Sequence, residues 1–535
     1  MNFLTPLRPV LLAASLVLLA LPAPVFAAPA PTPARPNILF IFSDDHSLQS
    51  IGAYRTWLSD FIRAQAITPN IDRLAAQGAL FERSFCGNSI CSPSRATVLS
   101  GVHTHRNGVT HLGGSIRPGV WTFPPALQAA GYQTALIGKW HLGNTPEGFD
   151  HWSVLPGQGH YWKPVFKGPD GREETVEGYT TDVITEKALA WLRDRDKARP
   201  FLLLAHHKAP HRPWNPAERH YRLLADVTVP EPPTLFDDYA GRTSSARSQQ
   251  MEIGRDMTLP SDLKVLPPEQ APPRLTPAQA AAWRAAFGPR NAAFRAAKLE
   301  GRELTRWKYQ EYMKDYLRCV KAVDDGVGRL LDYLRAEGLE TNTVVIYSAD
   351  QSFFNGEHGW FDKRWIYEES LTMPLVVRWP GVIRAGTRIP QMVQNIDYAP
   401  TFMEMAGLHA PDSVQGRSLV PLLRGESPAD WRRSIYYHYY DPGHAVQKHY
   451  GIRTERHTLA HFYPVQEWEL YDLQQDPRQL RSLHADPAHA AVLAELKGEL
   501  TRLRALYQDT DEPRPAPADA RPRNRARARA TEPAP

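Results

Sequence analysis

The chain has 535 residues, which exceeds the usual size of a single hydrophobic core, so we expect two domains. Its net charge of +5 comes mostly from its ends, because residues 512–535 carry six Arg against three acids and Arg8 adds another positive charge. The remaining body is nearly neutral, which argues against a protein that binds nucleic acid.

Residues 1–28 have the pattern of a signal peptide. Arg8 precedes an apolar run at 10–21, and Val25-Phe26-Ala27 would be the cleavage site. The run is short for a membrane span and is followed by proline, so an uncleaved anchor is the weaker alternative. No later segment is apolar enough to cross a membrane. We therefore expect an exported protein, periplasmic or secreted, with a Pro/Ala linker at 29–35.

Four continuous apolar runs predict strands that are buried on both faces of a mostly parallel sheet. They are Asn37–Phe42, Gln133–Ile137, Phe201–Ala205 and Thr343–Tyr347. Helical patterns alternate with these runs, at 71–78, 182–194 and 309–337. The alternation predicts an α/β fold with a large mixed, mostly parallel sheet sandwiched by helices.

Residues 227–304 interrupt this alternation and are rich in Pro, Ala, Arg and Gln. We interpret them as an insertion with irregular chain and an Ala-rich helix, which could help to wall a substrate pocket. The C-terminal part has the pattern of short antiparallel strands and a final helix, at 435–440, 449–453, 467–471 and 488–507. This pattern divides the chain into a catalytic domain at 36–426, a smaller α+β subdomain with a short antiparallel sheet at 427–511, and a disordered Arg/Pro/Ala tail at 512–535.

Each of the four predicted strands ends in polar residues. These ends are Ser43-Asp44-Asp45, Gly138 to Gly143, His206 to Pro213, and Ser348 to Gln351. In an open α/β sheet, ligands bind outside the carboxyl ends of the strands, so the four clusters can converge. Three carboxylates and an amide oxygen are the hard ligands that Ca²⁺ or Mg²⁺ prefers. Without a metal, adjacent carboxylates would repel each other, which raises their pKa.

Cys91 is the most informative of the three cysteines, which are Cys86, Cys91 and Cys319. An odd number leaves at least one thiol unpaired. Pro93 suits the first turn of a helix, so Cys91 would lie at a helix N-terminus, where backbone N–H groups favour an anion. A buried structural cysteine, or a disulfide between Cys86 and Cys91, would be the alternative explanation.

The run Asn88–Gly101, with Cys91-Ser92-Pro93-Ser94-Arg95 at its centre, resembles the signature of the type I sulfatases. Other segments match motifs of the same family in the same order, namely Pro36–Asp45, Gly138–Gly143, Ala209–Pro213, Gly356–Gly359 and Lys363–Ser370. The likeness extends from Pro36 to about Asp511 and is weakest in the insertion. It implies the alkaline-phosphatase-like α/β fold and the hydrolysis of sulfate esters.

The resemblance also implies the cofactors. In this family a maturation enzyme oxidises the cysteine to formylglycine, and the hydrate of that aldehyde attacks sulfur. By position, the residues that would bind a Ca²⁺ ion, with Mg²⁺ as the less favoured ion, are Asp44, Asp45, Asp350, Gln351 and the modified Cys91. Gln351 is followed by Ser352 where the family commonly has Gly, which puts any positive φ at that turn in doubt.

The remaining catalytic roles are also implied by position. Arg95 would hold the formylglycine hydrate, and Lys139 and Lys363 would bind the sulfate oxygens. His211, assisted by Lys363, would protonate the leaving alkoxide. His141 would then take a proton from the second hydroxyl of the hydrate.

The stretch Phe353–Arg364 most resembles sulfatases that act on sugar sulfates, including glucosamine-6-sulfate. In the C-terminal subdomain, His444, His449 and Arg453 are candidates for substrate contact. We therefore expect a sulfatase whose substrate is a sulfated carbohydrate, such as a glycosaminoglycan-like fragment. The alternatives are a phosphonate or phosphate-diester hydrolase of the same superfamily, or a catalytically silent glycan-binding homologue. No prediction follows for the oligomeric state.

Overall fold

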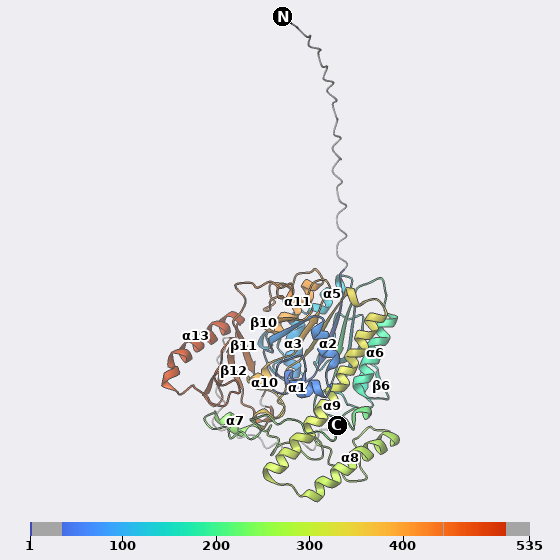
Figure 1. The fold of residues 1–535 in the computed structure, drawn as a ribbon, viewed down its shortest axis with the longest axis vertical. Helices are drawn as coiled ribbons and strands as arrows, with labels where there is room; N and C mark the ends of the chain where they lie inside the picture. The colour runs from blue at the N-terminus through green and yellow to red at the C-terminus, as the bar shows by residue number, and fades with distance from the viewer. Residues whose placement is uncertain (3–34, 442, 510–535) are drawn as a thin grey trace. The chain divides into compact units, whose positions relative to one another are not determined.

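The computed structural model describes residues 1–2, 35–441 and 443–509 (Figure 1). The predicted tail at 512–535 lies outside these residues, as do the predicted signal peptide and linker apart from Met1, Asn2 and Arg35. Within the described part, none of the helices is both long enough and apolar enough to span a bilayer.

A ten-stranded sheet, in the order β10-β2-β9-β8-β1-β7-β3-β4-β5-β6, contains the four predicted strands as consecutive neighbours. They are β8 (Thr343–Ala349), β1 (Asn37–Ser43), β7 (Phe201–His206) and β3 (Gln133–Lys139). All three pairings among them are parallel, and the register places Phe42 beside both His206 and Ser348. The carboxyl ends of these strands are therefore level with one another.

The flanking strands make the sheet mixed. They are β2 (Ala79–Phe85), β9 (Leu375–Arg378), β10 (Thr387–Gln394), β4 (His151–Leu155), β5 (Val165–Lys167) and β6 (Glu173–Thr175). Strand β9 is antiparallel to β8 and β2, and β5 is antiparallel to β4 and β6, whereas β2 with β10 and β3 with β4 are parallel pairs. The expected large, mostly parallel sheet is confirmed.

Helices cover both faces of the sheet (Figure 1). Alternate residues of β1 belong to two separate hydrophobic clusters, with Ile38 and Phe40 in one and Leu39 and Ile41 in the other. The first cluster includes α3 (Cys91–Ser100), α5 (Phe123–Ala129) and α11 (Tyr398–Met405). The second includes α2 (Pro69–Ala76), α6 (Thr180–Asp194) and α9 (Gly301–Ala336). Burial on both sides explains why the central strands are continuously apolar.

The atypical segment 227–304 contains α7 (Ser244–Ser248), α8 (Pro277–Ala297) and the first residues of α9, joined by irregular chain. The expected Ala-rich helix is α8. Thr276 caps its N-terminus. The Thr276 side chain accepts a hydrogen bond from the Gln279 backbone N–H, and the Gln279 side chain accepts one from the Thr276 backbone N–H. In Figure 1, α8 and the first part of α9 lie at the lower end of the view, beyond the strands.

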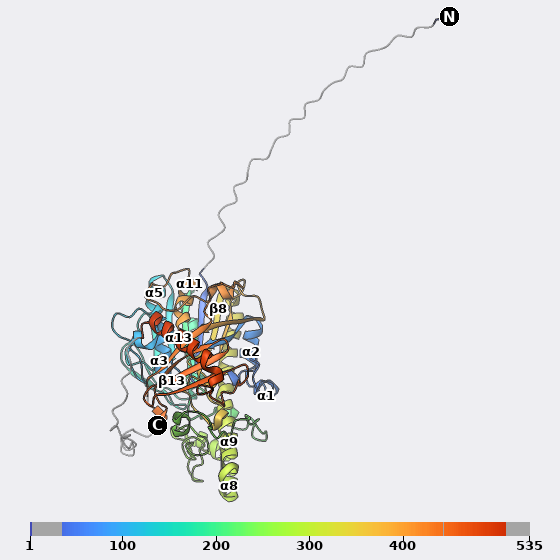
Figure 2. The same ribbon diagram turned by 90° about the vertical axis from the view of Figure 1, so that its left-hand side faces the viewer.

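The C-terminal part forms a four-stranded antiparallel sheet covered by a helix. Its elements are β11 (Ser434–Tyr439), β12 (His449–Thr454), β13 (His457–Phe462), β14 (Glu467–Asp472) and α13 (Ala490–Tyr507). One sheet face packs against α13 through residues such as Ile452 and Leu500, as Figure 2 shows from the side. The other face contributes Ile435 and Tyr437 to the first hydrophobic cluster, the one that contains Ile38 and Phe40. The expected fold class is confirmed, whereas the domain boundary at 426 stays a prediction.

Short helices complete the architecture. They are α1 (Ser59–Ala64), α4 (Thr104–Asn107), α10 (Glu368–Leu371) and α12 (Val420–Leu423). Of these, α10 forms the end of the Lys363–Ser370 motif. The chain then enters strand β9, which lies beside β8 in the sheet. This arrangement places the Lys363 segment over the carboxyl ends of the central strands.

Candidate active site

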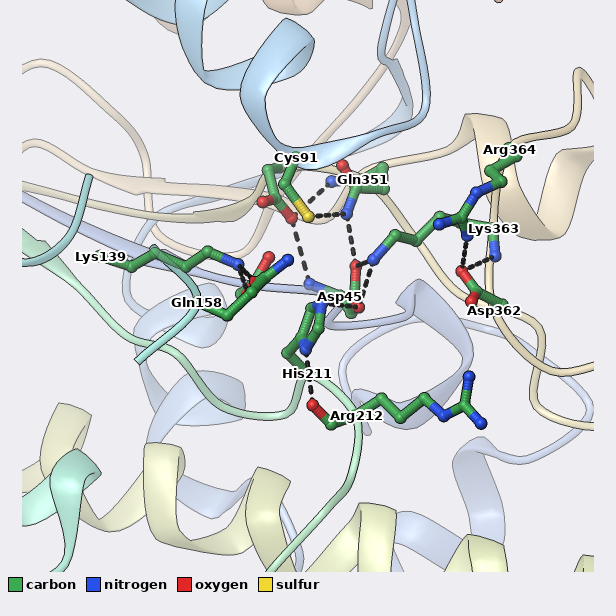
Figure 3. Close-up of polar contacts among 12 residues, drawn as sticks. Asp45, Cys91, Lys139, Gln158, His211, Arg212, Gln351, Asp362, Lys363 and Arg364 are labelled. Atoms are coloured by element: carbon green, nitrogen blue, oxygen red, sulfur yellow. Dashed lines mark hydrogen bonds and ion pairs between the residues drawn. The ribbon is translucent and has the colours of Figure 1, made fainter. Parts of the chain in front are cut away.

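The polar residues that follow the four central strands meet at one edge of the sheet. Backbone hydrogen bonds link these strand ends: Asp44 N donates to Ala209 O at 3.3 Å, and Asp350 N donates to Ser43 O at 3.2 Å. The backbone N–H of Asp45 and that of Gln351 each donate to Asp350 Oδ1 at 3.1 Å. Figure 3 shows the resulting cluster, with Cys91 on one side and His211 on the other.

The three carboxylates of Asp44, Asp45 and Asp350 are fully buried, and one oxygen from each lies within 4.8 Å of the others. Two further buried oxygens, Asp44 Oδ1 and Gln351 Oε1, have no hydrogen-bond partner among the described residues. Buried polar atoms without partners are costly and rare, so each of these oxygens calls for a ligand. A hard, oxygen-binding cation fits this donor set. The predicted acidic cluster is therefore a fitting metal site.

The electrostatics of the cluster point the same way. Burial and the neighbouring Asp44 raise the pKa of Asp350 to about 8, although Arg95 opposes them. Burial likewise raises the pKa of Asp45 to about 6 against the effect of Lys363. Burial also acts on Asp44, but Lys139, His211 and Arg95 outweigh it and lower its pKa. A divalent cation would favour the ionised form of all three carboxyl groups.

Gln351 lies in the cluster as predicted, but its amide faces the carboxylate with its nitrogen. Gln351 Nε2 donates to Asp45 Oδ1 and lies 3.9 Å from Cys91 Sγ. The reason is electrostatic, because an anionic carboxylate attracts the donor end of the amide. Ser352, the residue that departs from the family pattern, does not adopt a positive φ. Its hydroxyl accepts a hydrogen bond from Leu48 N at 3.1 Å, so serine is accommodated at this turn.

Three cations surround the acidic cluster. Lys139 Nζ pairs with Asp44 and donates to Gln158 Oε1 at 2.6 Å, whereas Lys363 Nζ lies 2.6 Å from both oxygens of Asp45. The guanidinium of Arg95, on α3, donates to Asp350 Oδ2 and to Lys139 O, each at 3.0 Å. The three predicted cationic side chains are therefore in place.

Gly138 has a backbone conformation that helps to place Lys139. Its φ is +109°, and a Cβ at this position would lie 1.9 Å from His206 O on the neighbouring strand. Only glycine fits such a close approach in this region of φ. Gly138 thus helps to orient the last residue of β3, Lys139, toward Asp44.

Cys91 is the first residue of α3 and is completely buried. Its sulfur lies within 4.8 Å of a carboxylate oxygen of Asp44 and a ring nitrogen of His211. Burial raises the pKa of the thiol, so an unmodified Cys91 would be a poor nucleophile at neutral pH. All three cysteines are free thiols, and the alternative disulfide between Cys86 and Cys91 is not formed.

The two predicted histidines differ in their contacts. His211 Nδ1 lies 2.7 Å from its acceptor Arg212 O, so its Nε2 is the nitrogen that faces the site, 3.8 Å from Asp45 Oδ2. His141 has a φ of +57° and a buried Nδ1 without a hydrogen-bond partner in the described part. Burial and Lys139 lower its pKa to about 2, so its ring is neutral and resists protonation in the cluster as it stands.

The structure adds residues to which sequence reasoning gave no role. Asp362 and Arg364 flank Lys363, form an ion pair and have φ values of +82° and +90°. Their position next to Lys363 was a signal that could have found them. Gln158 carried no such signal, because no motif surrounds it. His444, predicted from the C-terminal subdomain, lies with this group, its Nε2 being 3.4 Å from Asp362 Oδ2.

The other two predicted substrate contacts are not brought to the cluster. His449 is fully buried, with Nδ1 bonded to Gln447 O at 2.8 Å and Nε2 accepting from Ile366 N at 3.2 Å. Arg453 forms an ion pair with Glu368 at 2.8 Å. The ring nitrogens of His449 and the guanidinium of Arg453 thus have partners within the chain, and substrate contact by either residue stays a prediction.

Comparison with known proteins gives the family. Residues 36–408 match the family model "Sulfatase", and residues 356–506 match "N-sulphoglucosamine sulphohydrolase, C-terminal". An N-acetylglucosamine-6-O-sulfatase of Bacteroides thetaiotaomicron is 44% identical over 89% of this chain and 88% of that protein. A solved structure described as a complex with its substrate D-glucosamine-2-N,6-O-disulfate is also 44% identical, with a TM-score of 0.86 over 89% of this chain and 99% of that one.

More distant structures share the fold. The phosphonate monoester hydrolase of Agrobacterium radiobacter is 22% identical, with a TM-score of 0.64 over 88% of this chain and 96% of that one. At that identity the likeness concerns the fold alone. The sulfatase matches, in contrast, include the segments that carry the site. The resemblance found in the sequence is thus confirmed: the chain belongs to the sulfatase family and is a sulfuric ester hydrolase.

Proposed function

We propose that this sulfatase removes the 6-O-sulfate from glucosamine or N-acetylglucosamine residues of sulfated carbohydrates. The observation that carries the proposal is the convergence of Cys91, three carboxylates, two lysines and His211 on one edge of the sheet. The choice of sugar is supported by the N-acetylglucosamine-6-O-sulfatase that is 44% identical over most of this chain.

Two groups would complete the site. A Ca²⁺ ion held by Asp44, Asp45, Asp350 and Gln351 supplies positive charge to the sulfate oxygens, and formylglycine derived from Cys91 supplies the nucleophilic hydroxyl. The burial of Cys91 among cations and carboxylates supports this assignment, since the thiol itself is held in its unreactive form. A formylglycine-generating enzyme would carry out this modification on a protein that is exported, as the signal-peptide pattern of residues 1–28 suggests.

The side chains of the chain itself bind and orient the sulfate group. Lys139 and Lys363 lie on opposite sides of the acidic cluster, so their ammonium groups can contact different oxygens of one sulfate. Arg95 is anchored by the Lys139 carbonyl and holds Asp350 in place beside the nucleophile. The sulfate would thus replace carboxylates as the partner of both lysines.

Two histidines can move protons at this site. His211 Nε2 faces the cluster, and its other nitrogen is held by the Arg212 carbonyl, so a proton on Nε2 would be aimed at the leaving oxygen. His141 is neutral because burial and Lys139 lower its pKa to about 2, so its Nδ1 would take a proton from the nucleophile only after a bound sulfate offsets the charge of Lys139. Burial also lowers the pKa of His211, although Asp44 opposes it, and because its Nδ1 donates to the Arg212 carbonyl the acid role requires the imidazolium form, with a second proton on Nε2.

The sugar would be recognised beside Lys363. Asp362, Arg364 and His444 form a connected group of hydrogen-bonding side chains next to this sulfate-binding lysine. Burial would raise the pKa of Asp362, but Arg364 outweighs it and holds this carboxyl ionised. An ionised acid and a guanidinium side by side are suited to bind neighbouring hydroxyl groups of a sugar.

The test is a panel of sulfated monosaccharides assayed with the matured enzyme and with Cys91→Ala. We expect the 6-O-sulfates of glucosamine and N-acetylglucosamine to be turned over and sulfates at other positions to be left intact. Cys91→Ala should be inactive with an unchanged melting temperature. Mass spectrometry of the Cys91 peptide should show that sulfur has been lost. A faster turnover of an aryl phosphodiester than of any sulfate would refute the proposed function.

A further inference from the structure

A cavity lies beside the proposed reaction centre, separate from the acidic cluster. It has a volume of about 350 Å³, in the range of pockets that hold small ligands. One wall is the segment Gly159–Trp162, another is the loop that carries His211, and the third comes from the insertion, at Pro260, Ser261 and Pro272–Arg274. The insertion therefore lines a pocket that adjoins the site.

Short contacts join this cavity to the reaction centre. Tyr161, in its wall, donates its hydroxyl proton to His211 O at 2.5 Å. Gln158, the residue before that wall, accepts a hydrogen bond from Lys139. Lys208 lies in the wall, and its carbonyl accepts from His211 N at 3.1 Å. If the sulfate of a substrate lay between Lys139 and His211, a neighbouring group of the same substrate could extend into the cavity.

Lys208 is the unusual residue of this pocket. Its side chain is almost completely buried, yet no hydrogen bond or ion pair to its ammonium is found in the described part of the chain. Its ammonium nitrogen lies over the ring of Tyr161, 4.9 Å from the ring centroid. Burial and the nearby Lys139 lower its pKa to about 8. A buried cation without a counter-ion is costly, so it is normally retained for a partner that arrives later.

The surrounding charges favour an anion. The residues that line the cavity include Arg274, His160 and Lys264 but neither Asp nor Glu. Lys264 is already paired with Asp315 at 2.8 Å, which leaves Lys208 and Arg274 to act on the cavity. Arg274 is held by the carbonyls of Trp162 and Lys163, so its guanidinium is fixed in position.

The acids that reach Lys208 electrostatically, Asp44 and Asp45, belong to the proposed ion site. Each of them is already paired with another lysine, Lys139 and Lys363 respectively. A bound Ca²⁺ would engage them further. Neither carboxylate therefore serves as the partner of Lys208.

We propose that this cavity is a subsite for a second anionic group of the substrate, bound by Lys208 with Arg274. The proposal rests on the proposed function, because it assumes that a 6-O-sulfate occupies the reaction centre. The second group is an oxyanion, either an N-sulfate on the same sugar or the carboxylate of a neighbouring uronic acid. The insertion would then determine which sulfated fragments the enzyme selects.

Binding measurements on the Cys91→Ala variant test this subsite without turnover. Isothermal titration calorimetry would compare N-acetylglucosamine-6-O-sulfate, glucosamine-2-N,6-O-disulfate, and a disaccharide of N-acetylglucosamine-6-O-sulfate with a uronic acid. We expect at least one ligand with a second anion to bind about tenfold or more tightly than the monosulfate, as for a charged hydrogen bond. Which ligand gains identifies the source of the anion.

Adding Lys208→Met to Cys91→Ala should bring that affinity ratio to within about twofold of one, because the charged hydrogen bond is lost. Lys208→Gln, which removes the charge but keeps a polar end, should do the same. Lys187→Met is the matched control, since Lys187 lies outside this cavity and pairs with the exposed Glu174. It should keep the ratio of the parent. The melting temperature of the Lys208 variants should change little, since the ammonium loses only its contact with the Tyr161 ring.

The outcomes separate the two hypotheses. If the monosulfate binds but a second anion gives no gain, or if both Lys208 variants keep the gain, the subsite is refuted and the proposed function stands. If none of the 6-O-sulfated ligands binds, the proposed function fails, and the subsite with it. A loss of the gain in Lys187→Met as well would also overturn the subsite, because the effect would then be one of overall charge.

Discussion

Replacing Asp350 with Asn should stabilise the chain in the absence of Ca²⁺, and most of this advantage over wild type should disappear in excess Ca²⁺. Burial and the repulsion of Asp44 raise the pKa of Asp350 from 3.8 to about 8. A carboxyl group whose pKa is higher in the folded state destabilises the fold above its unfolded pKa. The penalty therefore grows as the pH rises from about 4 to about 8, and Asn removes it.

The magnitude follows from the pKa difference. At pH 7 the penalty, 1.36 × (7 − 3.8), is on the order of 4 kcal/mol, and at pH 5 it is on the order of 2 kcal/mol. The figure at pH 7 is an upper limit, because Arg95 loses an ionic partner in the variant. With an unfolding entropy of about 2.1 cal/mol/K per residue, a chain of this size changes its Tm by on the order of 1 K per kcal/mol. The variant should thus melt up to about 4 K higher at pH 7 in EDTA.

Calcium should cancel most of this difference. A ligand at about 1,000 times its Kd stabilises the folded state by about 4 kcal/mol, or about 4 K here. Wild type should gain this and Asp350→Asn should gain little, because one of the three carboxylates that fit the ion is gone.

The assay is differential scanning calorimetry of both proteins at pH 5 and pH 7, in EDTA and in excess Ca²⁺. Asp332→Asn, which removes an exposed partner of Arg73, is the control and should leave both transitions in place. The reasoning would be wrong if the variant melted below wild type in EDTA at pH 7. It would also be wrong if Ca²⁺ raised the melting temperature of both proteins equally.

Three further outcomes are expected at the site. His211→Ala should lower kcat on a sugar sulfate about 10²–10⁴-fold and much less on an aryl sulfate with a good leaving group, and equal losses would argue against proton donation. Lys363→Met should lower kcat/KM about 10²–10³-fold in the same steady-state assay, and an unchanged value would place the sulfate elsewhere. Gly138→Ala should lower the melting temperature by more than Gly131→Ala, since both have positive φ but a Cβ meets His206 O only at Gly138. Equal shifts would show that this clash is relieved.

The central part of the fold could be predicted because its strands are buried on both faces. Residues 38–42 of β1 alternate between two hydrophobic clusters, so each of these positions must be apolar and the strand is visible as a continuous run. Strands at the edges carry no such pattern. The three residues of β6, Glu173–Thr175, are all exposed, and β5 has three residues, so neither could be distinguished from loop.

The candidate site could be predicted to the extent that its residues lie in motifs at strand ends. Asp44 and Asp350 follow adjacent parallel strands, so topology alone brings them together. His449 begins β12 and pairs with Tyr439 of β11, and only the packing of this sheet decides that its ring is buried against Tyr437. Gln158 and Lys208 were beyond reach for another reason, since their roles depend on the path of an irregular loop and on the insertion packed against it.

The balance of charges in the cluster explains how the site can fold before its ion arrives. Three carboxyl groups face three cations, Arg95, Lys139 and Lys363, and Asp350 is largely protonated at pH 7 because its pKa is about 8, so the apo cluster carries a small excess of positive charge. An added divalent cation would leave an excess of positive charge at the edge of the sheet. That excess attracts a sulfate ester, which carries one negative charge, and with Lys208 beside it the attraction would be greater for a substrate with two.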